Sequence, residues 1–246
     1  MLSKSRGIVL NTLKYNDETL IAQVLTEEVG YRTFSVRIAR GRKIRSTHIF
    51  FFPLSLVELT WEEKPNAKLV TPKTVSVSTP LVSIPMEPQK VTIAMFLGEF
   101  LNHALRSEPS SPELFAYLYN SILWLDAKSN RYANFHLVFL LRLTKFIGLF
   151  PERPLYIPGG YFDLRTASYT QFRPTHNDYL EPREAQLIPT LLRMRYENMH
   201  LFHFSGSERN HFLAVINEFY RIHIPNFPEL KSLAVLRDFY EGMKDF

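Results

Sequence analysis

The sequence predicts an α+β protein in which a small N-terminal β-barrel is followed by an α-helical domain with an irregular inserted lobe. Residues 1–79 contain several short β-prone segments and no helical pattern, whereas residues 89–246 are dominated by apolar side chains at the helical period. A proline-rich stretch at 80–88 separates the two patterns. We therefore expect a barrel domain at 1–79, a linker at 80–88 and a helical domain at 89–246.

The N-terminal part has the period-two pattern of half-buried strands. We expect strands at 7–13, 19–26, 31–38, 49–61 and 67–77. In the third segment Phe34, Val36 and Ile38 alternate with polar or basic residues, so one face is apolar. Short strands that follow one another in so few residues indicate a small closed or nearly closed barrel. An oligonucleotide-binding fold (OB-fold) is the leading candidate, and a small SH3-like barrel is the alternative.

The C-terminal part has helical periodicity interrupted by turn signals. We expect helices at 91–105, 114–125, 134–147, 182–196, 205–221 and 231–240. Ser111-Pro112-Glu113 is a helix start, Gly148 a helix stop, and Ser205 with Glu208 a capping box. Prolines and the Gly159-Gly160 pair make 149–178 irregular, so we expect a separate small lobe there.

Composition limits the class of protein. The chain has 246 residues, 46% of them hydrophobic, which is enough for folded cores. It has no cysteine, so disulfides, thiol nucleophiles and cysteine-based metal sites are excluded. Its apolar runs are much shorter than the ~20 residues of a membrane span, and no secretory signal is visible. We expect a soluble cytoplasmic protein without cofactor or metal and without membrane contact.

The charge is concentrated in the first quarter of the chain. Residues 1–57 hold nine Lys/Arg and four Asp/Glu, so the whole formal excess of +5 lies there. A nucleic-acid backbone is the commonest partner of such a patch. The candidate phosphate-binding residues are Arg6, Lys14, Arg32, Arg37, Arg40, Arg42, Lys43 and Arg45. Tyr31, Phe34 and Phe50–Phe52 are possible base-stacking partners, although Phe34 lies on the apolar side of its strand and is expected in the core. The competing interpretation is a solvated loop.

No arrangement of residues indicates an enzyme. The eight histidines are scattered, no Gly-x-Ser-x-Gly elbow is present, and the glycine pair lacks a phosphate-loop pattern. In the apolar helix expected at 134–147, Arg142 and Lys145 could form a basic rim beside a groove for an acidic, hydrophobic peptide. The alternative for these two cations is simple exposure to solvent. A protein scaffold whose basic barrel face docks an acidic partner, without annealing DNA, is the alternative function.

Five strings along the chain have a characteristic order and spacing: Arg6–Leu10, Tyr15–Asp17, Val36–Arg40 with the basic loop after it, Tyr220–His223 and Leu230–Leu233. Together they resemble the bacterial recombination mediator family RecO. The resemblance implies an OB-fold barrel and a helical domain that act in DNA repair and recombination. It further implies binding to single- and double-stranded DNA, annealing of complementary strands, and work with RecR to load the RecA recombinase onto DNA coated by single-strand-binding protein. The acidic C-terminal tail of that coating protein is expected to dock on the helical domain.

The chain departs from this family pattern in one place. Many members carry four zinc-binding cysteines in a lobe equivalent to residues 149–178, and this chain has none. We therefore expect no bound zinc. Either aromatic packing holds the lobe together, or the lobe is more mobile than in its relatives. The aromatic candidates are Tyr156, Tyr161, Phe162, Tyr169 and Phe172.

Overall fold

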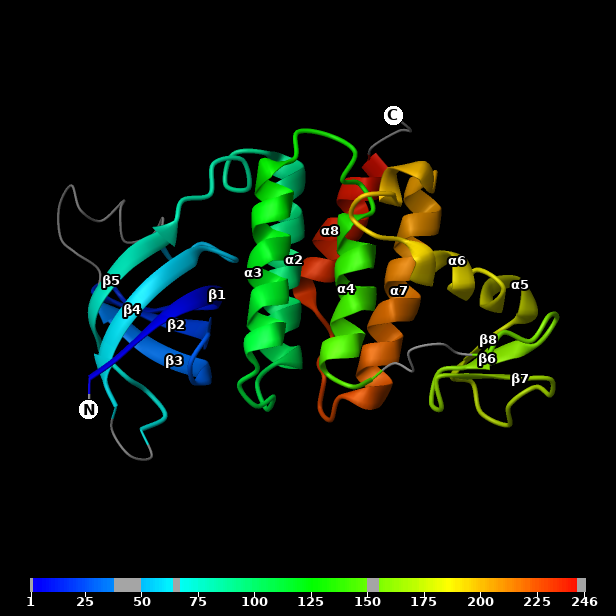
Figure 1. Cartoon of the computed structure of the whole chain (residues 1–246), viewed down its shortest axis with the longest axis horizontal. Helices are drawn as coiled ribbons and strands as arrows, with labels where there is room; N and C mark the ends of the chain where they lie inside the picture. The colour runs from blue at the N-terminus through cyan, green and yellow to red at the C-terminus, as the bar shows by residue number, and fades with distance from the viewer. Residues whose placement is uncertain (1, 38–49, 64–66, 150–154, 243–246) are drawn as a thin grey trace. The chain divides into compact units, whose positions relative to one another are not determined.

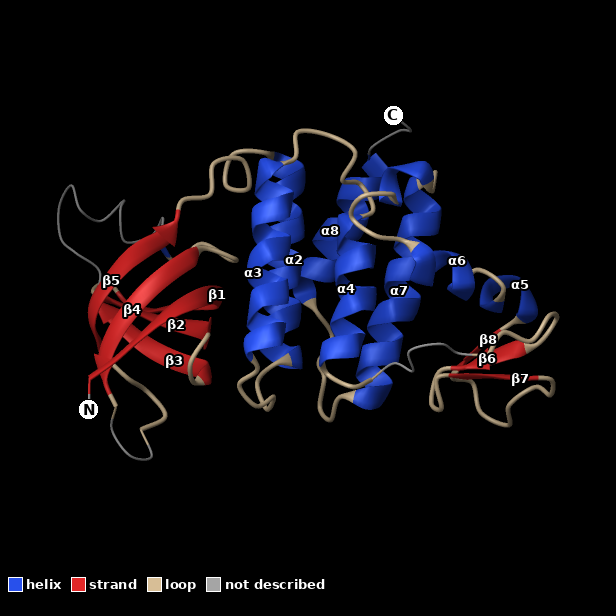
Figure 2. Cartoon of the chain, viewed as in Figure 1, coloured by secondary structure: helices blue, strands red, loops and turns tan. Residues whose placement is uncertain are grey.

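The computed structural model describes residues 2–37, 50–63, 67–149 and 155–242 (Figure 1). It divides into two compact units, one of Met1–Lys128 with Glu229–Phe239 and one of Ser129–Pro228 with Tyr240–Phe246. Strands dominate the first part of the chain and helices the rest, which confirms the predicted α+β class (Figure 2).

The N-terminal sheet is antiparallel, with strand order β3-β2-β1-β4-β5. Its strands are β1 (Leu2–Asn16), β2 (Thr19–Thr26), β3 (Gly30–Arg37), β4 (Leu56–Glu62) and β5 (Pro72–Thr79). The long strand β1 pairs with β4 from Leu2 to Ile8 and with β2 from Gly7 to Asn16, so it links the two halves of the sheet. An irregularity in its register between Val9 and Asn11 lets the sheet bend there.

The barrel core follows from the alternation seen in the sequence. Phe34, Val57, Leu59 and Trp61 point inward and are completely buried. The rings of Phe34 and Trp61 pack edge to face with centroids 5.4 Å apart. The prediction that Phe34 is a core residue is therefore confirmed.

The barrel is open rather than closed. Among the described residues, β3 and β5 share no continuous ladder, and the two edges meet at a parallel bridge between Phe34 and Val70. The bridge consists of the Ser35 N–H donating to the Val70 carbonyl (2.8 Å) and the Val70 N–H donating to the Thr33 carbonyl (3.0 Å). A five-stranded, partly open barrel is the architecture of an OB-fold.

Helices α2 (Pro88–Ala104) and α3 (Pro112–Ala127) belong to the same unit as the sheet. Helix α3 begins as predicted, because the Ser111 side chain accepts a hydrogen bond from the Leu114 N–H. Helix α2 packs closely on β1 at Gly98, where a Cβ atom would lie 2.6 Å from the Leu10 carbonyl oxygen. Glycine is therefore required at this contact.

Residues 82–87, within the segment expected to be a linker, form a turn that is hydrogen-bonded to α3. The Asp126 carboxylate accepts hydrogen bonds from the backbone N–H groups of Val82, Ser83 and Ile84, at 2.9, 2.8 and 2.8 Å. The fully buried Lys90 donates to the Ser83 hydroxyl (2.6 Å). The segment is thus fastened to the end of α3.

The second unit is mainly helical. Its elements are α4 (Phe135–Phe146), β6 (Tyr161–Asp163), β7 (Ser168–Thr170), β8 (Tyr179–Leu180), α5 (Pro182–Ala185), α6 (Ile188–Arg193), the 3-10 helix η2 (Met199–Leu201) and α7 (Gly206–His223). Helix α8 (Lys231–Gly242) has residues in both units. The capping box predicted from Ser205 and Glu208 is confirmed, and Gly148 follows α4 with a φ of 68°, as a helix stop requires.

Several predicted elements differ from the structure. The strand expected at 7–13 is the longer β1, and the strand expected at 67–77 is β5, which begins only at Pro72. The strand expected at 49–61 begins only at Leu56, because residues 51–55 turn through Pro53 and through Leu54 with a φ of 66°. The helix expected at 182–196 is two short helices, since Pro189 lies in the first turn of α6 and cannot continue a helix from α5. No helix within the described parts of the chain is long and apolar enough to cross a membrane.

Candidate nucleic-acid interface

The opening of the barrel carries a basic, aromatic hollow. Its volume is about 260 Å³, and Arg37, Lys73, Phe50 and Phe51 line it together with Thr71, Pro72, Val36 and Val75. Arg37 is the exposed last residue of β3, opposite Thr19 of β2, and Lys73 lies near the start of β5. We call these eight residues the barrel-opening hollow. It brings two cations from different strands to one place beside aromatic rings.

The two cations differ in their partners. Lys73 lies 2.5 Å from Glu62 of β4, with both side chains more than half exposed. No carboxylate in the described ranges forms an ion pair with Arg37. An exposed ion pair is weak, so Lys73 can exchange Glu62 for a phosphate at little cost.

Four of the predicted phosphate-binding residues, Arg40, Arg42, Lys43 and Arg45, lie outside the described residues. Arg32 lies on β3 away from the hollow's lining, half-buried, with its guanidinium 3.5 Å from Glu63. Its role in binding DNA stays a prediction.

Arg6 and Lys14 on β1 do not line the hollow. Arg6 donates two hydrogen bonds to Glu27 (2.8 and 2.6 Å), and its guanidinium lies 5.0 Å from the centre of the Tyr119 ring. The hydrogen bond from Arg6 lowers the pKa of Glu27. Lys14 pairs with Asp17 at 2.6 Å. Arg6 thus joins the sheet to α3, and its binding to DNA, like that of Lys14, stays a prediction.

Among the other proposed stacking residues, Tyr31 has a structural contact with helix α2. Its hydroxyl donates to the Asn102 side chain of α2 (2.8 Å), and burial raises its pKa. Phe50 and Phe52 are half-buried, and Phe51 is in the core. Phe50 and Phe52 are therefore partly accessible rings that, unlike Tyr31, have no hydroxyl bonded to α2.

The second predicted site lies on α4. Arg142 is half-buried, with its guanidinium 5.8 Å from the centre of the Tyr196 ring, and Lys145 is exposed. A small apolar cavity of about 50 Å³ lies beside the same helix, lined by Leu141 and Thr144 and by residues of α6, α7 and the lobe. Lys145 is one helical turn from Leu141, so it can serve as the rim of that cavity.

The lobe is held by aromatic packing and by a polar network. Phe162 and Tyr169 pack with ring centroids 5.0 Å apart, and Tyr156 packs on Tyr169 at 5.2 Å. Phe172, by contrast, is 80% exposed and takes no part in this core.

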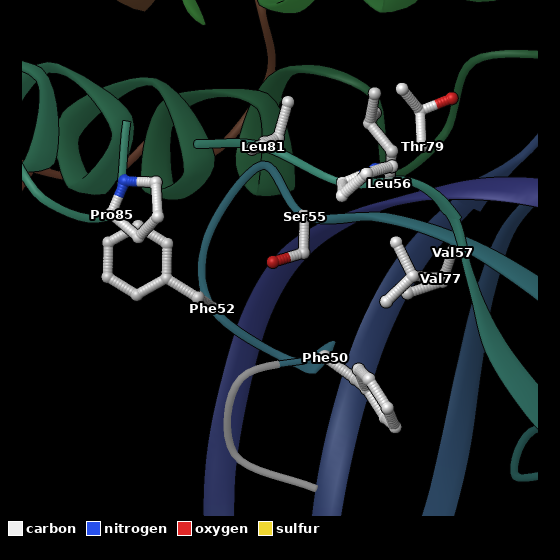
Figure 3. A pocket seen from close by; sticks show the side chains of 10 residues that line it. Phe50, Phe52, Ser55, Leu56, Val57, Val77, Thr79, Leu81 and Pro85 are labelled. Carbon is white, nitrogen blue, oxygen red and sulfur yellow. The ribbon is translucent and has the colours of Figure 1, made fainter. Parts of the chain in front are cut away.

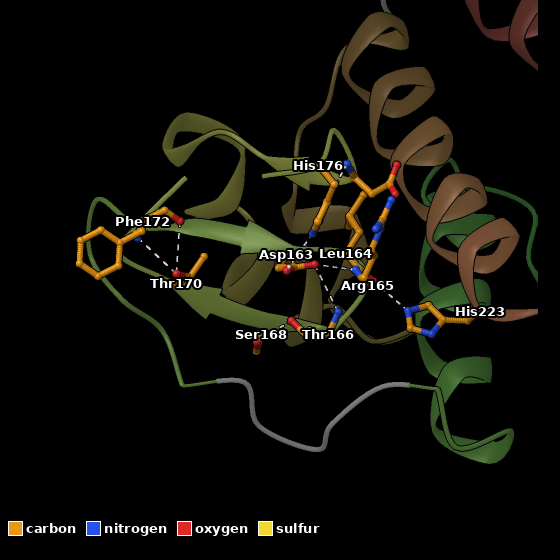
Figure 4. A network of polar contacts seen from close by, with 10 residues as sticks. Asp163, Leu164, Arg165, Thr166, Ser168, Thr170, Phe172, His176 and His223 are labelled. Carbon is orange, nitrogen blue, oxygen red and sulfur yellow. Dashed lines mark hydrogen bonds and ion pairs between the residues drawn. The ribbon is translucent and has the colours of Figure 1, made fainter. Parts of the chain in front are cut away.

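The polar network is centred on Asp163 of β6 (Figure 4). Asp163 accepts from the Arg165 backbone N–H (2.8 Å) and lies 3.3 Å from the His176 ring, while the Arg165 side chain donates to Asp178 (2.6 Å). His223 of α7 bonds the Leu164 carbonyl (2.8 Å) and ties the lobe to the helices. In the described residues no three His, Cys, Asp or Glu side chains are grouped as metal ligands.

An OB-like sheet with a basic opening, followed by a helical part, defines a class of nucleic-acid-binding proteins. The chain matches the family models described as Recombination protein O N terminal, over residues 1–80, and Recombination protein O C terminal, over residues 85–234. The chain belongs to the RecO family. It therefore has a role in DNA repair and recombination.

Relatives named DNA repair protein RecO match along nearly the whole chain. The relative from Bacteroides fragilis is 46% identical over 242 residues, which cover 98% of this chain and 100% of the relative. Those from Phocaeicola vulgatus and Flavobacterium johnsoniae are 45% and 31% identical, with the same coverage of both chains.

Sequence reasoning missed Lys73. It lies in a segment that was correctly expected to be a strand, but its closeness to Arg37 depends on how the sheet curls to bring β5 near β3. The only signal available was an isolated lysine after Pro72, which is too weak to identify a site.

Proposed function

We propose that this protein is a non-enzymatic DNA-binding mediator that binds single and double strands through its barrel and anneals complementary strands. The observation that carries the proposal is the barrel-opening hollow, where Arg37 and Lys73 lie beside Phe50. The excess of +5 in residues 1–57 supports it, because these residues include β1 to β3. Annealing requires neutralised phosphates and accessible bases, and needs no catalytic group.

An annealing assay with two complementary oligonucleotides tests the proposal. The Arg37→Ala/Lys73→Ala variant should anneal more slowly than the wild type, because two phosphate contacts are lost. Lys4→Ala is a matched control, since Lys4 is also an exposed strand lysine that pairs with a glutamate (Glu58, 3.0 Å) but lies outside the hollow. Equal annealing rates for the double variant and the wild type would contradict the proposal, as would binding of an acidic protein without any annealing.

We further propose that the protein works with RecR to help load RecA onto DNA coated by single-strand-binding protein. Membership of the RecO family supports this role. The measurement is RecA filament formation on coated DNA with purified RecR. Omission of this protein should delay filament formation, and an equal rate without it would contradict the role.

The acidic C-terminal tail of single-strand-binding protein is the partner we propose for α4. Lys145 and Arg142 can pair with its carboxylates, and the apolar cavity beside Leu141 can accept an apolar side chain. Titration of a peptide of that tail should show binding that Arg142→Ala/Lys145→Ala weakens. Unchanged affinity would remove these residues from the contact.

A further inference from the structure

A second pocket adjoins the barrel-opening hollow and is almost entirely apolar. Its volume is about 300 Å³, and its walls include Phe50, Phe52, Val57, Val77, Leu81 and Pro85 (Figure 3). Phe52 and Pro85 lie toward one end of the pocket and Val77 toward the other (Figure 3). Phe50 lines both this pocket and the hollow that contains Arg37 and Lys73. One aromatic ring therefore separates a basic surface from an apolar one.

The pocket opens because the barrel is not closed. Val57 and Val77 are partners in the β4–β5 ladder, and Val57 belongs to the barrel core. Val77 is nevertheless 39% exposed, since no strand covers that part of β5 within the described residues. The pocket thus gives access to a patch of the inner face of the barrel.

One wall of the pocket is held in place by buried polar groups. Leu81 and Pro85 flank the turn whose N–H groups bond Asp126, and the buried Lys90 also donates to the Lys128 carbonyl. Burial opposes ionisation of Asp126, but the hydrogen bonds from the backbone of Val82, Ile84 and Ser83 lower its pKa overall. A charged anchor of this kind fixes the wall before any ligand binds, which reduces the entropic cost of binding.

The chemistry of the two adjoining surfaces indicates what fits them. A ligand that contacts both the barrel-opening hollow and this pocket needs anionic groups to pair with Arg37 and Lys73. It also needs a neighbouring apolar group that fits a pocket with aromatic walls. Single-stranded nucleic acid has this alternation of phosphate and planar base, and protein side chains bind bases by stacking on aromatic rings. In a duplex the bases are paired and stacked inside, so they cannot enter.

We propose that the pocket lined by Phe50, Phe52 and Val77 receives an unstacked base of single-stranded DNA whose phosphates lie on Arg37 and Lys73. This inference rests on the proposed DNA-binding function and adds a selection for single strands to it. The phosphate contacts serve both forms of DNA, whereas the pocket serves single strands alone.

The test fills the pocket without touching the cations. Val77→Trp places an indole in it at a partly exposed position, and Val77→Ala is the matched control that leaves it open. Binding of a short labelled single strand and of its duplex is measured by fluorescence anisotropy over a range of salt concentrations. Val77→Trp should weaken single-strand binding about 5- to 150-fold, the usual effect of one lost stacked base. Duplex affinity and the salt slope should not change.

An oligonucleotide of abasic sites gives a second measurement that does not depend on how the variant folds. The wild type should bind it about as weakly as Val77→Trp binds the normal strand. Unchanged single-strand affinity in Val77→Trp, or equal losses for strand and duplex, would overturn the base pocket. If Val77→Trp weakens binding of a partner protein and leaves DNA binding unchanged, the pocket is a binding site for that protein and the base pocket is refuted. A failure of the proposed function looks different, because Arg37→Ala/Lys73→Ala would then leave both DNA affinities unchanged.

Discussion

Asp126 is predicted to be a main anchor between the barrel strands and the helices of the first unit. Asp126→Ala removes the acceptor for three backbone N–H groups, at 2.9, 2.8 and 2.8 Å. Val82 is 73% exposed, so water can replace its lost partner, whereas Ile84 is completely buried and Ser83 half-buried. A buried donor left without a partner costs about 1–3 kcal/mol. The free energy of unfolding should therefore fall by about 2–4 kcal/mol.

Urea unfolding followed by tryptophan fluorescence measures this loss selectively. The two tryptophans of the chain, Trp61 and Trp124, both lie in the first unit. Asp17→Ala is the control, since Asp17 is 93% exposed and has one ion pair; it should change stability by less than about 0.5 kcal/mol. Because the folded-state pKa of Asp126 is lowered, its contribution is present above its unfolded pKa and disappears as the pH falls through the folded value. If Asp126→Ala unfolds at the same urea concentration as the wild type and Asp17→Ala, the hydrogen bonds to Asp126 do not stabilise the first unit.

Three further changes test other parts of the fold. Gly98→Ala should destabilise the first unit by about 1–3 kcal/mol in urea unfolding, because its Cβ meets the Leu10 carbonyl; a gain in stability, as expected of an ordinary helical glycine, would contradict the close contact. Burial lowers the pKa of His136 to about 3. As the pH falls below about 6.5, the unfolded chain therefore binds a proton at this histidine and the folded chain does not. The free energy of unfolding should then fall by up to about 1.4 kcal/mol per pH unit. His136→Gln should remove that part of the pH dependence, and parallel profiles for the two proteins would refute it. Arg6→Ala should lower the unfolding free energy by only about 0.5–1 kcal/mol, because the two hydrogen bonds to Glu27 that it removes are exposed to solvent. Single-strand affinity is a separate readout, and lost affinity without lost stability would instead give Arg6 a direct role in binding DNA.

Local patterns in the sequence predicted most of the elements. The strand at Thr19–Thr26 and the capping box at Ser205 depend on neighbours within a few residues, and both are confirmed at the predicted positions. The division at Pro189 was missed because the apolar spacing of 182–196 is helical on both sides of the proline. The apolar pattern predicted one continuous helix, although Pro189 lacks the backbone N–H that a continuous helix needs at that position.

Long-range pairing set the limits for the candidate site. The charge excess predicted a basic barrel, and Arg37 does lie at its opening. Lys73, 36 positions later in the numbering, joins it only because β5 curls back toward β3. The segment 80–88 was interpreted as a linker from its prolines, and the hydrogen bonds from its turn to Asp126 were not foreseen because Asp126 lies more than 40 residues away along the chain. Neither contact leaves a local trace in the sequence.

The salt dependence of single-strand binding tests the central claim, that the barrel opening is a phosphate-binding surface, most directly. The slope of the logarithm of the binding constant against the logarithm of salt concentration should be less steep in Arg37→Ala/Lys73→Ala than in the wild type, by about 1.4, because each lost contact with single-stranded DNA removes about 0.7. Lys4→Ala should keep the wild-type slope. An identical slope in all three proteins would show that DNA binds elsewhere.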